Sequence, residues 1–424
     1  MKDFNILDYG AKSTDILQTN EIQAALDACF LAGGGRVIIP CGIFYTGSIR
    51  VRSNTTLYLE TGAILRGSRY ITDYFGYRED KLEPISEYVA PEGVKFCGST
   101  NPYSDWNSGL IKVINAENVS IIGERGSYID GQDSHNPDGE EHYRGAHAIN
   151  IYNSKNLYFE GYTITNSGNW AHNLYVCENI KIKNVTVLGG HDGFDVRTCS
   201  DITIEDCVFK TGDDAIAGFD NIGVVIRNCI LDCACSALRF GGTNVLIESC
   251  KSIAPSSYGF RNWLTPEEKA KSANTHAGCR HSMHTPFQYY CDYRANMRVA
   301  AGNITVRNCE FLNPNAIFLH PFDGEHQWCC NRPLTDITFE NCKFLGLTLP
   351  GVLCSDTEEP LEFRLKDCVI SSLEEGADFP IFDAKNCKYI EFDNVKVEGF
   401  KDAFVTIDNP EVMRVKGGSS IKFK

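Results

Sequence analysis

The sequence repeats about every 22 residues, and this period limits the possible folds more than any other feature. Each repeat alternates apolar and polar residues and is rich in Ile, Val, Thr and Phe, which predicts a β-strand. One unit is too short to close into a domain, so the units must stack on one another. The clearest four repeats are offset by 22, 22 and 21 residues: Asn179–Val187 (NIKIKNVTV), Asp201–Phe209 (DITIEDCVF), Gly223–Leu231 (GVVIRNCIL) and Asn244–Ser252 (NVLIESCKS).

This period predicts an all-β fold, a parallel β-helix in which each coil contains three short strands and successive coils lie about 4.8 Å apart. Related segments extend from about Asn118 to Val397. A β-propeller blade needs about 40 residues and a leucine-rich repeat needs regularly spaced Leu, and neither pattern occurs. A recurring dipeptide marks equivalent positions of the coils: Asp206-Cys207, Asn228-Cys229, Asn308-Cys309, Asn341-Cys342, Asp367-Cys368 and Asn386-Cys387.

The segment from Thr19 to Gly35, TNEIQAALDACFLAGGG, predicts an amphipathic helix that covers the open N-terminal end of the solenoid. Asn20 and Gln23 could form a capping box, and Gly33 to Gly35 would end the helix. We expect residues 1–424 to form a single domain. Insertions that break the repeat near 69–110, 125–147, 252–300 and 319–334 could wall a groove.

The composition argues against two classes of binding partner and indicates the cellular compartment. The formal charge of −15 argues against binding to nucleic acid or to an anionic membrane, since both need a basic surface. The chain contains no apolar run typical of a signal peptide or of a transmembrane helix, so we expect a cytoplasmic protein. The 19 Cys are odd in number, and we expect most to be reduced, buried thiols. The oligomeric state is left open.

Three carboxylates stand at equivalent places in adjacent repeats. Asp192 and Asp214 are 22 residues apart, and Asp213 immediately precedes Asp214. Carboxylates this close cannot all ionise freely, so at least one pKa should rise. A protonated acid beside an ionised carboxylate is what glycoside hydrolysis requires. The alternative is a solvated turn after Gly212.

Several motifs resemble those of one enzyme family. They are GGGRVIIPCGIFYTGSIRVRSNTTLYLETGAILRGS, which follows the predicted helix, then IDG, NSGNWAHNLYVCENIKIKNVTV, GHDGFD and GDD. The chain resembles glycoside hydrolase family 28, the polygalacturonase family. That resemblance implies a right-handed parallel β-helix and inverting hydrolysis without a cofactor. Asp213 would be the general acid, and Asp192 and Asp214 would position and deprotonate water.

The resemblance also supplies substrate-binding candidates, and the chain departs from the family at some of them. Ser236 stands where the family has a catalytic-site His, and Trp263 stands where it has a Lys that reads the substrate carboxylate. Arg239 and Arg261 could hold a carboxylate, and Trp263 could stack on a sugar ring. Alternatively, Arg239 could pair with the Asp cluster and Trp263 could anchor the loop that follows it. The remaining candidates, all within the matching motifs, are His172, His191 and Asp195.

These departures predict poor activity on plain polygalacturonan. The insertions at 69–110 and 252–300 should close one end of the groove, which predicts exo-cleavage of short pectin-related oligosaccharides. The stretch containing His276, Cys279, His281 and His284 matches no standard zinc spacing, so we expect no metal there. A β-helix uronate lyase or epimerase, and a non-catalytic glycan-binding β-helix, are the alternatives. The three acids favour a hydrolase over both.

Overall fold

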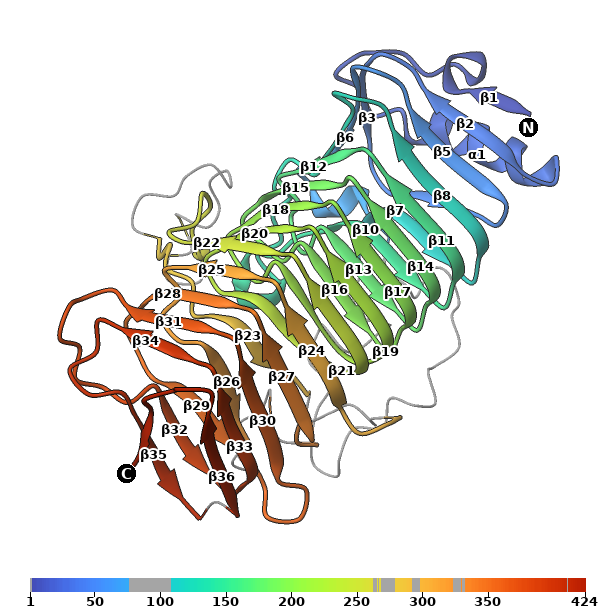
Figure 1. Cartoon of the computed structure of the whole chain (residues 1–424). Coiled ribbons are helices and arrows are strands. Elements are labelled where there is room, and N and C mark those ends of the chain that lie inside the picture. Colours follow the sequence, from blue (N-terminus) through green and yellow to red (C-terminus); the bar gives the residue numbers. More distant parts are fainter. Residues whose placement is uncertain are drawn as a thin grey trace.

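The computed structural model describes residues 2–75, 108–261, 265, 267, 279–291, 298–322, 329, 332–409 and 411–424. The chain winds into an elongated solenoid with its termini at opposite ends (Figure 1). Every strand pairing in the described part is parallel, and strands of successive coils stack into three faces. The fold is a right-handed parallel β-helix, as predicted.

The first face is the twelve-stranded sheet, in which strands from successive coils pair in sequence order. Its strands are β3 (Gly42–Thr46), β6 (Ala63–Gly67), β9 (Tyr128–Asp130), β12 (Thr163–Thr165), β15 (Thr186–Gly189), β18 (Val208–Thr211), β20 (Ile230–Cys233), β22 (Lys251–Ile253), β25 (Glu310–Leu312), β28 (Lys343–Leu347), β31 (Val369–Ser372) and β34 (Lys396–Glu398).

The second face follows the first within each coil. Two long strands, β19 (Ile216–Arg227) and β21 (Ser236–Glu248), begin on this face and continue around the corner. The other strands are β4 (Ile49–Val51), β7 (Gly109–Ile114), β10 (His147–Tyr152), β13 (His172–Tyr175), β16 (Phe194–Arg197), β23 (Thr285–Tyr289), β26 (Phe318–Pro321), β29 (Gly351–Cys354), β32 (Phe382–Lys385), β35 (Phe404–Asp408) and β37 (Lys422–Phe423).

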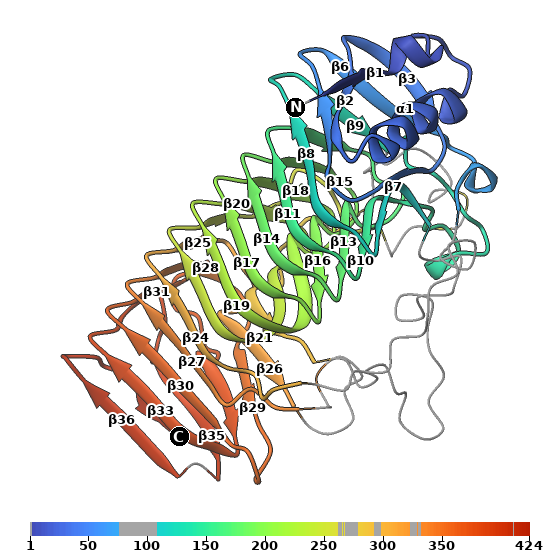
Figure 2. The ribbon, with the colours of Figure 1, turned by 90° about the vertical axis from the view of Figure 1, so that its right-hand side faces the viewer.

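The third face completes the coil and includes the second halves of β19 and β21. Its other strands are β1 (Asp3–Asn5), β2 (Gly35–Ile39), β5 (Thr55–Leu59), β8 (Glu117–Gly123), β11 (Lys155–Glu160), β14 (Glu178–Lys183), β17 (Ser200–Glu205), β24 (Gly302–Arg307), β27 (Asp336–Glu340), β30 (Leu361–Lys366), β33 (Cys387–Asp393) and β36 (Val412–Lys416). Figure 2 shows how the three faces enclose a continuous interior.

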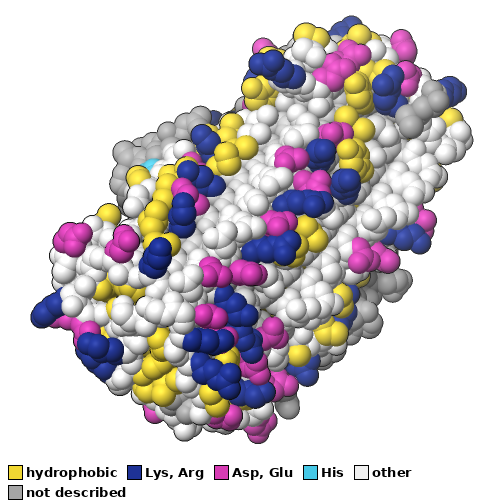
Figure 3. Space-filling view, in the orientation of Figure 1, with side chains coloured by type: hydrophobic (Ala, Val, Ile, Leu, Met, Phe, Trp, Pro, Cys, Tyr) yellow, Lys and Arg dark blue, Asp and Glu magenta, His cyan; other side chains and the backbone are white. Residues whose placement is uncertain are grey.

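The predicted register is confirmed on the third face, where Ile180 pairs with Ile202 and Ile202 pairs with Val224. These side chains point inward into a core that runs the length of the solenoid. On the outside, ion pairs such as Lys155 with Glu117 connect neighbouring coils, and charges of both signs are interspersed over the face shown in Figure 3.

Five of the six repeated dipeptides form the corner between the third and first faces, where Ser249-Cys250 holds the same place in another coil. The equivalence predicted for Asn386-Cys387 is wrong, because this pair lies between β32 and β33, on the corner between the second and third faces. The Asn or Asp of each dipeptide takes a left-handed backbone conformation, which these residues tolerate, with φ of 55° at both Asp206 and Asn228. The Asn228 side chain donates to Asp206 one coil away. The following cysteines point inward as a buried column: Cys207, Cys229, Cys250, Cys309, Cys342 and Cys368. All seventeen cysteines in the described part are free thiols.

The predicted cap is present as α1 (Thr19–Leu31), which buries Ile22, Leu26 and Cys29 against the first coil. The predicted capping box is wrong. The helix already begins at Thr19, and the Gln23 amide donates to the carbonyl of Arg50 instead of returning to the helix start.

Two predicted insertions are less continuous than expected. The region 125–147 contains β9, and the region 252–300 contains β23, so repeat strands interrupt both. Most of the region 69–110 lies outside the described residues, as does part of 319–334. Among the described residues, no helix is long and apolar enough to cross a membrane. Whether the chain is a single domain stays a prediction.

Candidate active site

The three predicted carboxylates lie in the turns that connect the first face to the second. One turn lies between β15 and β16, and the next between β18 and β19. The Gly193 amide donates to the carbonyl of Asp214 over 3.1 Å, and the Asp214 amide donates to Asp192 Oδ1 over 3.2 Å. Asp192 and Asp214 therefore occupy adjacent rungs, as the 22-residue offset predicted.

A glycine makes the tight turn before Asp213 possible. A β-carbon on Gly212 would lie 2.3 Å from the carbonyl oxygen of Gly259 and 2.8 Å from that of Gly190. Both distances are too short for a side chain, so the close stacking of backbone at this corner requires glycine. The turn thus fixes where the Asp213 and Asp214 side chains begin.

Asp214 is almost completely buried and is held by two donors. Arg239 Nε lies 3.0 Å from Asp214 Oδ2, and the Ser236 amide donates to Oδ1 over 2.8 Å. Arg239 is itself positioned over the Tyr290 ring, 4.5 Å from its centroid. The Ser236 hydroxyl donates to Gln288 Oε1 over 3.3 Å.

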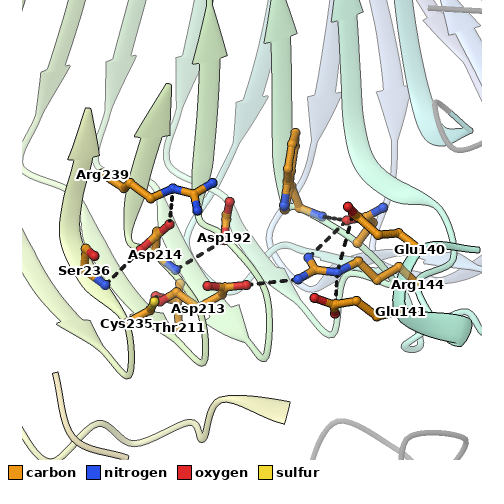
Figure 4. Close-up of polar contacts among 12 residues, drawn as sticks. Glu140, Glu141, Arg144, Asp192, Thr211, Asp213, Asp214, Cys235, Ser236 and Arg239 are labelled. Atoms are coloured by element: carbon orange, nitrogen blue, oxygen red, sulfur yellow. Dashed lines mark hydrogen bonds and ion pairs between the residues drawn. The ribbon is translucent and has the colours of Figure 1, made fainter. Parts of the chain in front are cut away.

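Asp213 points the other way along the solenoid, toward an arginine that the sequence did not single out (Figure 4). Arg144 Nη2 lies 3.0 Å from Asp213 Oδ2, and Arg144 Nε lies 3.0 Å from Glu141 Oε2. Glu140 is 3.9 Å from the same guanidinium. Arg144 therefore sits between Asp213 and a pair of glutamates. The Asp213 side chain is 13% exposed, whereas that of Asp214 is 1% exposed, so Asp213 is the more accessible acid.

The loop that carries Arg144 packs closely against the solenoid. The Gly145 amide donates to the Gly168 carbonyl over 2.9 Å. A β-carbon on Gly145 would lie 2.0 Å from the carbonyl oxygen of Ser134, so this approach is open only to glycine. Arg144 is consequently held at the carboxylates by backbone contacts on its C-terminal side.

Burial and mutual repulsion raise the pKa of two of the acids. The pKa of Asp192 is raised well above its usual value, first by desolvation and then by the charges of Asp213 and Asp214. The pKa of Asp213 is raised by the same two causes, desolvation and the charge of Asp214, but the Arg144 charge opposes the rise. The cluster therefore favours retaining a proton alongside ionised carboxylates.

His191 and Arg261 lie beside this cluster but are enclosed. The His191 ring stacks on Tyr143 at 5.4 Å, and burial lowers its pKa well below the usual value. Arg261 Nη1 donates to Asp133 over 2.7 Å, and the Arg261 side chain is only 1% exposed. Arg261 is thus held in an internal ion pair and does not present its guanidinium to a ligand.

Asp195 is also paired internally, because Arg197 Nε lies 2.8 Å from its Oδ1. Its charge nevertheless contributes to the raised pKa of Asp192. Asp195 therefore supports the cluster electrostatically, from the neighbouring strand β16.

His172 is in the interior of the solenoid, not at the site. Its ring stacks on Phe194 at 3.8 Å, its Nε2 is hydrogen-bonded to Tyr162, and its Nδ1 to the carbonyl of Gly193. Burial lowers the pKa of His172 to about 3. It cannot contact a ligand outside the coils. Trp263 lies outside the described residues, so its assignment stays a prediction.

The stacked turns also bring Cys235 and His284 to the carboxylates. Ligand atoms of Asp213, Asp214 and Cys235 lie within 4.8 Å of one another, a spacing that could hold a metal ion. Burial and the charge of Asp214 raise the pKa of Cys235 well above its usual value, which keeps it a thiol and a poor ligand. His284 Nδ1 lies 3.9 Å from Cys235 Sγ. From the predicted His/Cys stretch, His276 is outside the described residues.

The fold and the site together define a parallel β-helix protein with the carboxylate cluster that glycoside hydrolysis requires. Residues 76–234 match the model of the family described as Glycosyl hydrolases family 28. This match over part of the chain agrees with the resemblance to glycoside hydrolase family 28 that the motifs indicated.

Curated relatives match part of the chain. A probable polygalacturonase of Vitis vinifera is 28% identical over 206 residues, which cover 45% of this chain and 39% of the relative. An exo-poly-alpha-D-galacturonosidase of Dickeya chrysanthemi is 25% identical over 255 residues, covering 51% of this chain and 41% of the relative. The chain thus spans about two fifths of the length of these relatives.

Solved structures share the fold over nearly the whole chain. The family 28 exopolygalacturonase of Yersinia enterocolitica superposes with a TM-score of 0.62 at 15% identity, covering 99% of this chain and 77% of that one. The A-module of the mannuronan C-5 epimerase AlgE4 of Azotobacter vinelandii reaches 0.60 at 12% identity, covering 98% and 100%. Since the same solenoid occurs in a hydrolase and an epimerase, the reaction must be argued from the site.

Proposed function

We propose that the protein is a glycosidase that hydrolyses pectin-related oligosaccharides with inversion at the anomeric carbon. The observation that carries this proposal is the stacking of an accessible acid, Asp213, beside the buried pair Asp192 and Asp214. In this mechanism the Asp213 carboxyl donates its proton to the glycosidic oxygen as the bond from that oxygen to C1 breaks. Water attacks C1 from the opposite face and gives its proton to the carboxylate of Asp192 or Asp214.

We further propose exo-cleavage of short chains and weak activity on plain polygalacturonan. Ser236 and not His stands beside Asp214, and Arg261 is held by Asp133, so fewer cationic groups are available to read galacturonate. Arg239, which pairs with Asp214, is partly exposed beside the acids, at 21%. Two similar proteins, from Dickeya chrysanthemi and Yersinia enterocolitica, carry names that describe exo-action on galacturonan, and these names support the exo assignment.

The alternative of a uronate lyase or epimerase fits the site less well. Such chemistry removes a proton next to a carboxylate and needs a neutral base, yet Arg144 and Arg239 are both ion-paired to acids. A non-catalytic glycan-binding role leaves the buried acids unexplained, because burying three carboxylates in one corner is costly.

The test is to incubate the purified protein with galacturonan, galacturonate oligomers, rhamnogalacturonan and neutral oligosaccharides. Early release of single sugars from short oligomers is expected, and proton NMR of the first products should show the inverted anomer. A retained anomer would contradict the inverting mechanism, and an unsaturated product absorbing in the ultraviolet would identify a lyase. Rapid random cleavage of polygalacturonan would contradict both the substrate and the exo assignments.

A further inference from the structure

The proposed acid is ion-paired in a way that opposes its task. Asp213 must carry a proton to donate it, yet Arg144 Nη2 lies 3.0 Å from its carboxylate. A guanidinium at this distance favours the ionised form of a carboxylate. Arg144 has an exposed fraction of only 6%, so solvent screens this interaction little.

Arg144 has other carboxylates within reach on the side away from Asp213. Its Nε is 3.0 Å from Glu141 and 3.9 Å from Glu140, and its Nη1 is 3.5 Å from Asn169 Oδ1. Figure 4 shows the guanidinium between Asp213 on one side and the two glutamates on the other. The arginine would therefore keep a counter-charge when Asp213 becomes neutral.

We propose that Arg144 is a positioning residue that controls when Asp213 carries its proton, with Glu140 and Glu141 taking over the guanidinium charge while Asp213 is protonated. This inference rests on the proposed role of Asp213 as the acid. In the free protein the ion pair with Arg144 opposes the rise in the pKa of Asp213 that burial and the charge of Asp214 cause. When a sugar oxygen contacts the Asp213 carboxylate, the guanidinium stays paired with the glutamates, and Asp213 takes up from water the proton that it then donates to that oxygen.

Other charged or titratable groups also act on Asp213, and the repulsion by Asp214 raises its pKa while Arg144 lowers it. The carboxylate of Asp214 repels the negative charge of Asp213, while Arg239 attracts it. The groups that face it from every element packed around it are Glu140, Glu141, Tyr143, Arg144, Asp192, Asp214, Cys235, Arg239 and His284.

The proposal predicts opposite shifts from two variants. In Arg144→Gln the pKa of Asp213 rises, so the high-pH limb of kcat/KM, where the acid loses its proton, should move up by about one pH unit. Glu141→Gln removes a nearby negative charge and should move the same limb down. Arg144→Lys should return the limb toward the wild-type position. Arg298→Gln removes a partly buried arginine paired with Asp220 on another corner and should leave the profile unchanged.

A second measurement does not depend on turnover. Infrared difference spectra of the protein with labelled Asp, with Asp213→Asn identifying the band, follow protonation of Asp213 directly. This carboxyl should bind its proton at higher pH in Arg144→Gln and at lower pH in Glu141→Gln than in the wild type. Glu141 is 22% exposed, so its variant should fold even if Arg144→Gln does not.

These outcomes separate the two proposals. Unchanged titration of Asp213 in both variants would overturn the role of Arg144. The titration of Asp213 could also shift while the low-pH limb of kcat/KM moves and the high-pH limb does not. Asp213 would then be the base, and this result would overturn the proposal as well. Shifted titration in a protein that hydrolyses none of the oligosaccharides would support the control by Arg144 while contradicting the proposed function.

Discussion

The amide of Asp214 donates a hydrogen bond of 3.2 Å to the carboxylate of Asp192 on the preceding coil. The main chain of one coil thus orients the acid of its neighbour, and the carbonyl of Asp214 accepts from Gly193 in the same ladder. Because this geometry comes from backbone pairing, a single side-chain change at the site should alter the chemistry while leaving the scaffold in place.

Asp213→Asn should lower kcat by about 10²- to 10⁴-fold, because it removes the proton donor but keeps the shape of the side chain. Asp192→Asn and Asp214→Asn should have comparable effects, and combinations should not be additive. The matched control is Asp206→Asn on the outer corner, where Asn occupies equivalent positions of other coils. Initial rates and circular dichroism on all four variants test this. Near wild-type rates in any acid variant would remove that residue from the mechanism.

Arg239→Gln should destabilise the protein by about 3–5 kcal/mol and nearly abolish activity, because it leaves the buried Asp214 without its counter-charge. Arg227→Gln, which breaks an exposed pair with Glu205, should cost less than about 1 kcal/mol. Urea unfolding of both variants gives the comparison. Equal losses in the two would show that Arg239 does not stabilise Asp214.

Gly212→Ala should cost about 1–3 kcal/mol and disturb the acids, since its new methyl group would meet the carbonyls of Gly259 and Gly190. Gly189→Ala one coil earlier adds a methyl group that lies 3.6 Å from its nearest neighbour, an ordinary contact, and should be tolerated. Thermal unfolding and activity of the pair measure the difference. A stable, active Gly212→Ala protein would contradict the described turn.

The buried histidines predict that stability falls in acid. Burial lowers the pKa of His172 and His320 to about 3 and that of His284 to about 4, below the usual 6.5. The unfolded chain therefore binds protons that the folded chain does not, and stability should be complete above pH 6.5 and decline from there toward pH 3.

His172→Gln should reduce that decline by roughly 1.4 kcal/mol per pH unit, the effect of one proton, whatever its absolute stability. His142→Asn, which changes an exposed histidine, is the control and should leave the slope unchanged. Urea unfolding at several pH values between 4 and 7 gives the slopes. Identical slopes for His172→Gln and the wild type would show that His172 is protonated in the folded protein.

The periodic part of the molecule could be predicted from the sequence because each coil uses the same inward and outward positions. The offset of 22 residues correctly predicted that Asp192 and Asp214 lie on adjacent coils. The same offset could have placed His172, which lies 22 residues before the inward-facing Phe194 and shares its register. The predicted role of His172 in substrate binding is therefore wrong, because its side chain faces the core.

The contacts that complete the site could not be predicted, because they join segments without a common period. Arg144 and Asp213 are 69 residues apart, and Arg261 and Asp133 are 128 residues apart. Arg144 lies in the charged stretch GEEHYRG of the insertion at 125–147, which was expected to wall a groove, but the sequence does not show which of its side chains reaches the acids. Only the packing of that loop shows that Arg144 does and that Arg261 is occupied elsewhere.

The column of inward cysteines gives each of six coils its own chemical reporter. Because these thiols are almost fully buried in the core, an alkylating reagent can reach one only when its coil separates from the next. The rate at which Cys207, Cys229, Cys250, Cys309, Cys342 and Cys368 are labelled would therefore trace, coil by coil, where the solenoid opens first. An oligosaccharide bound at Asp213 should slow labelling at the coils that carry the acids and leave distant coils unchanged.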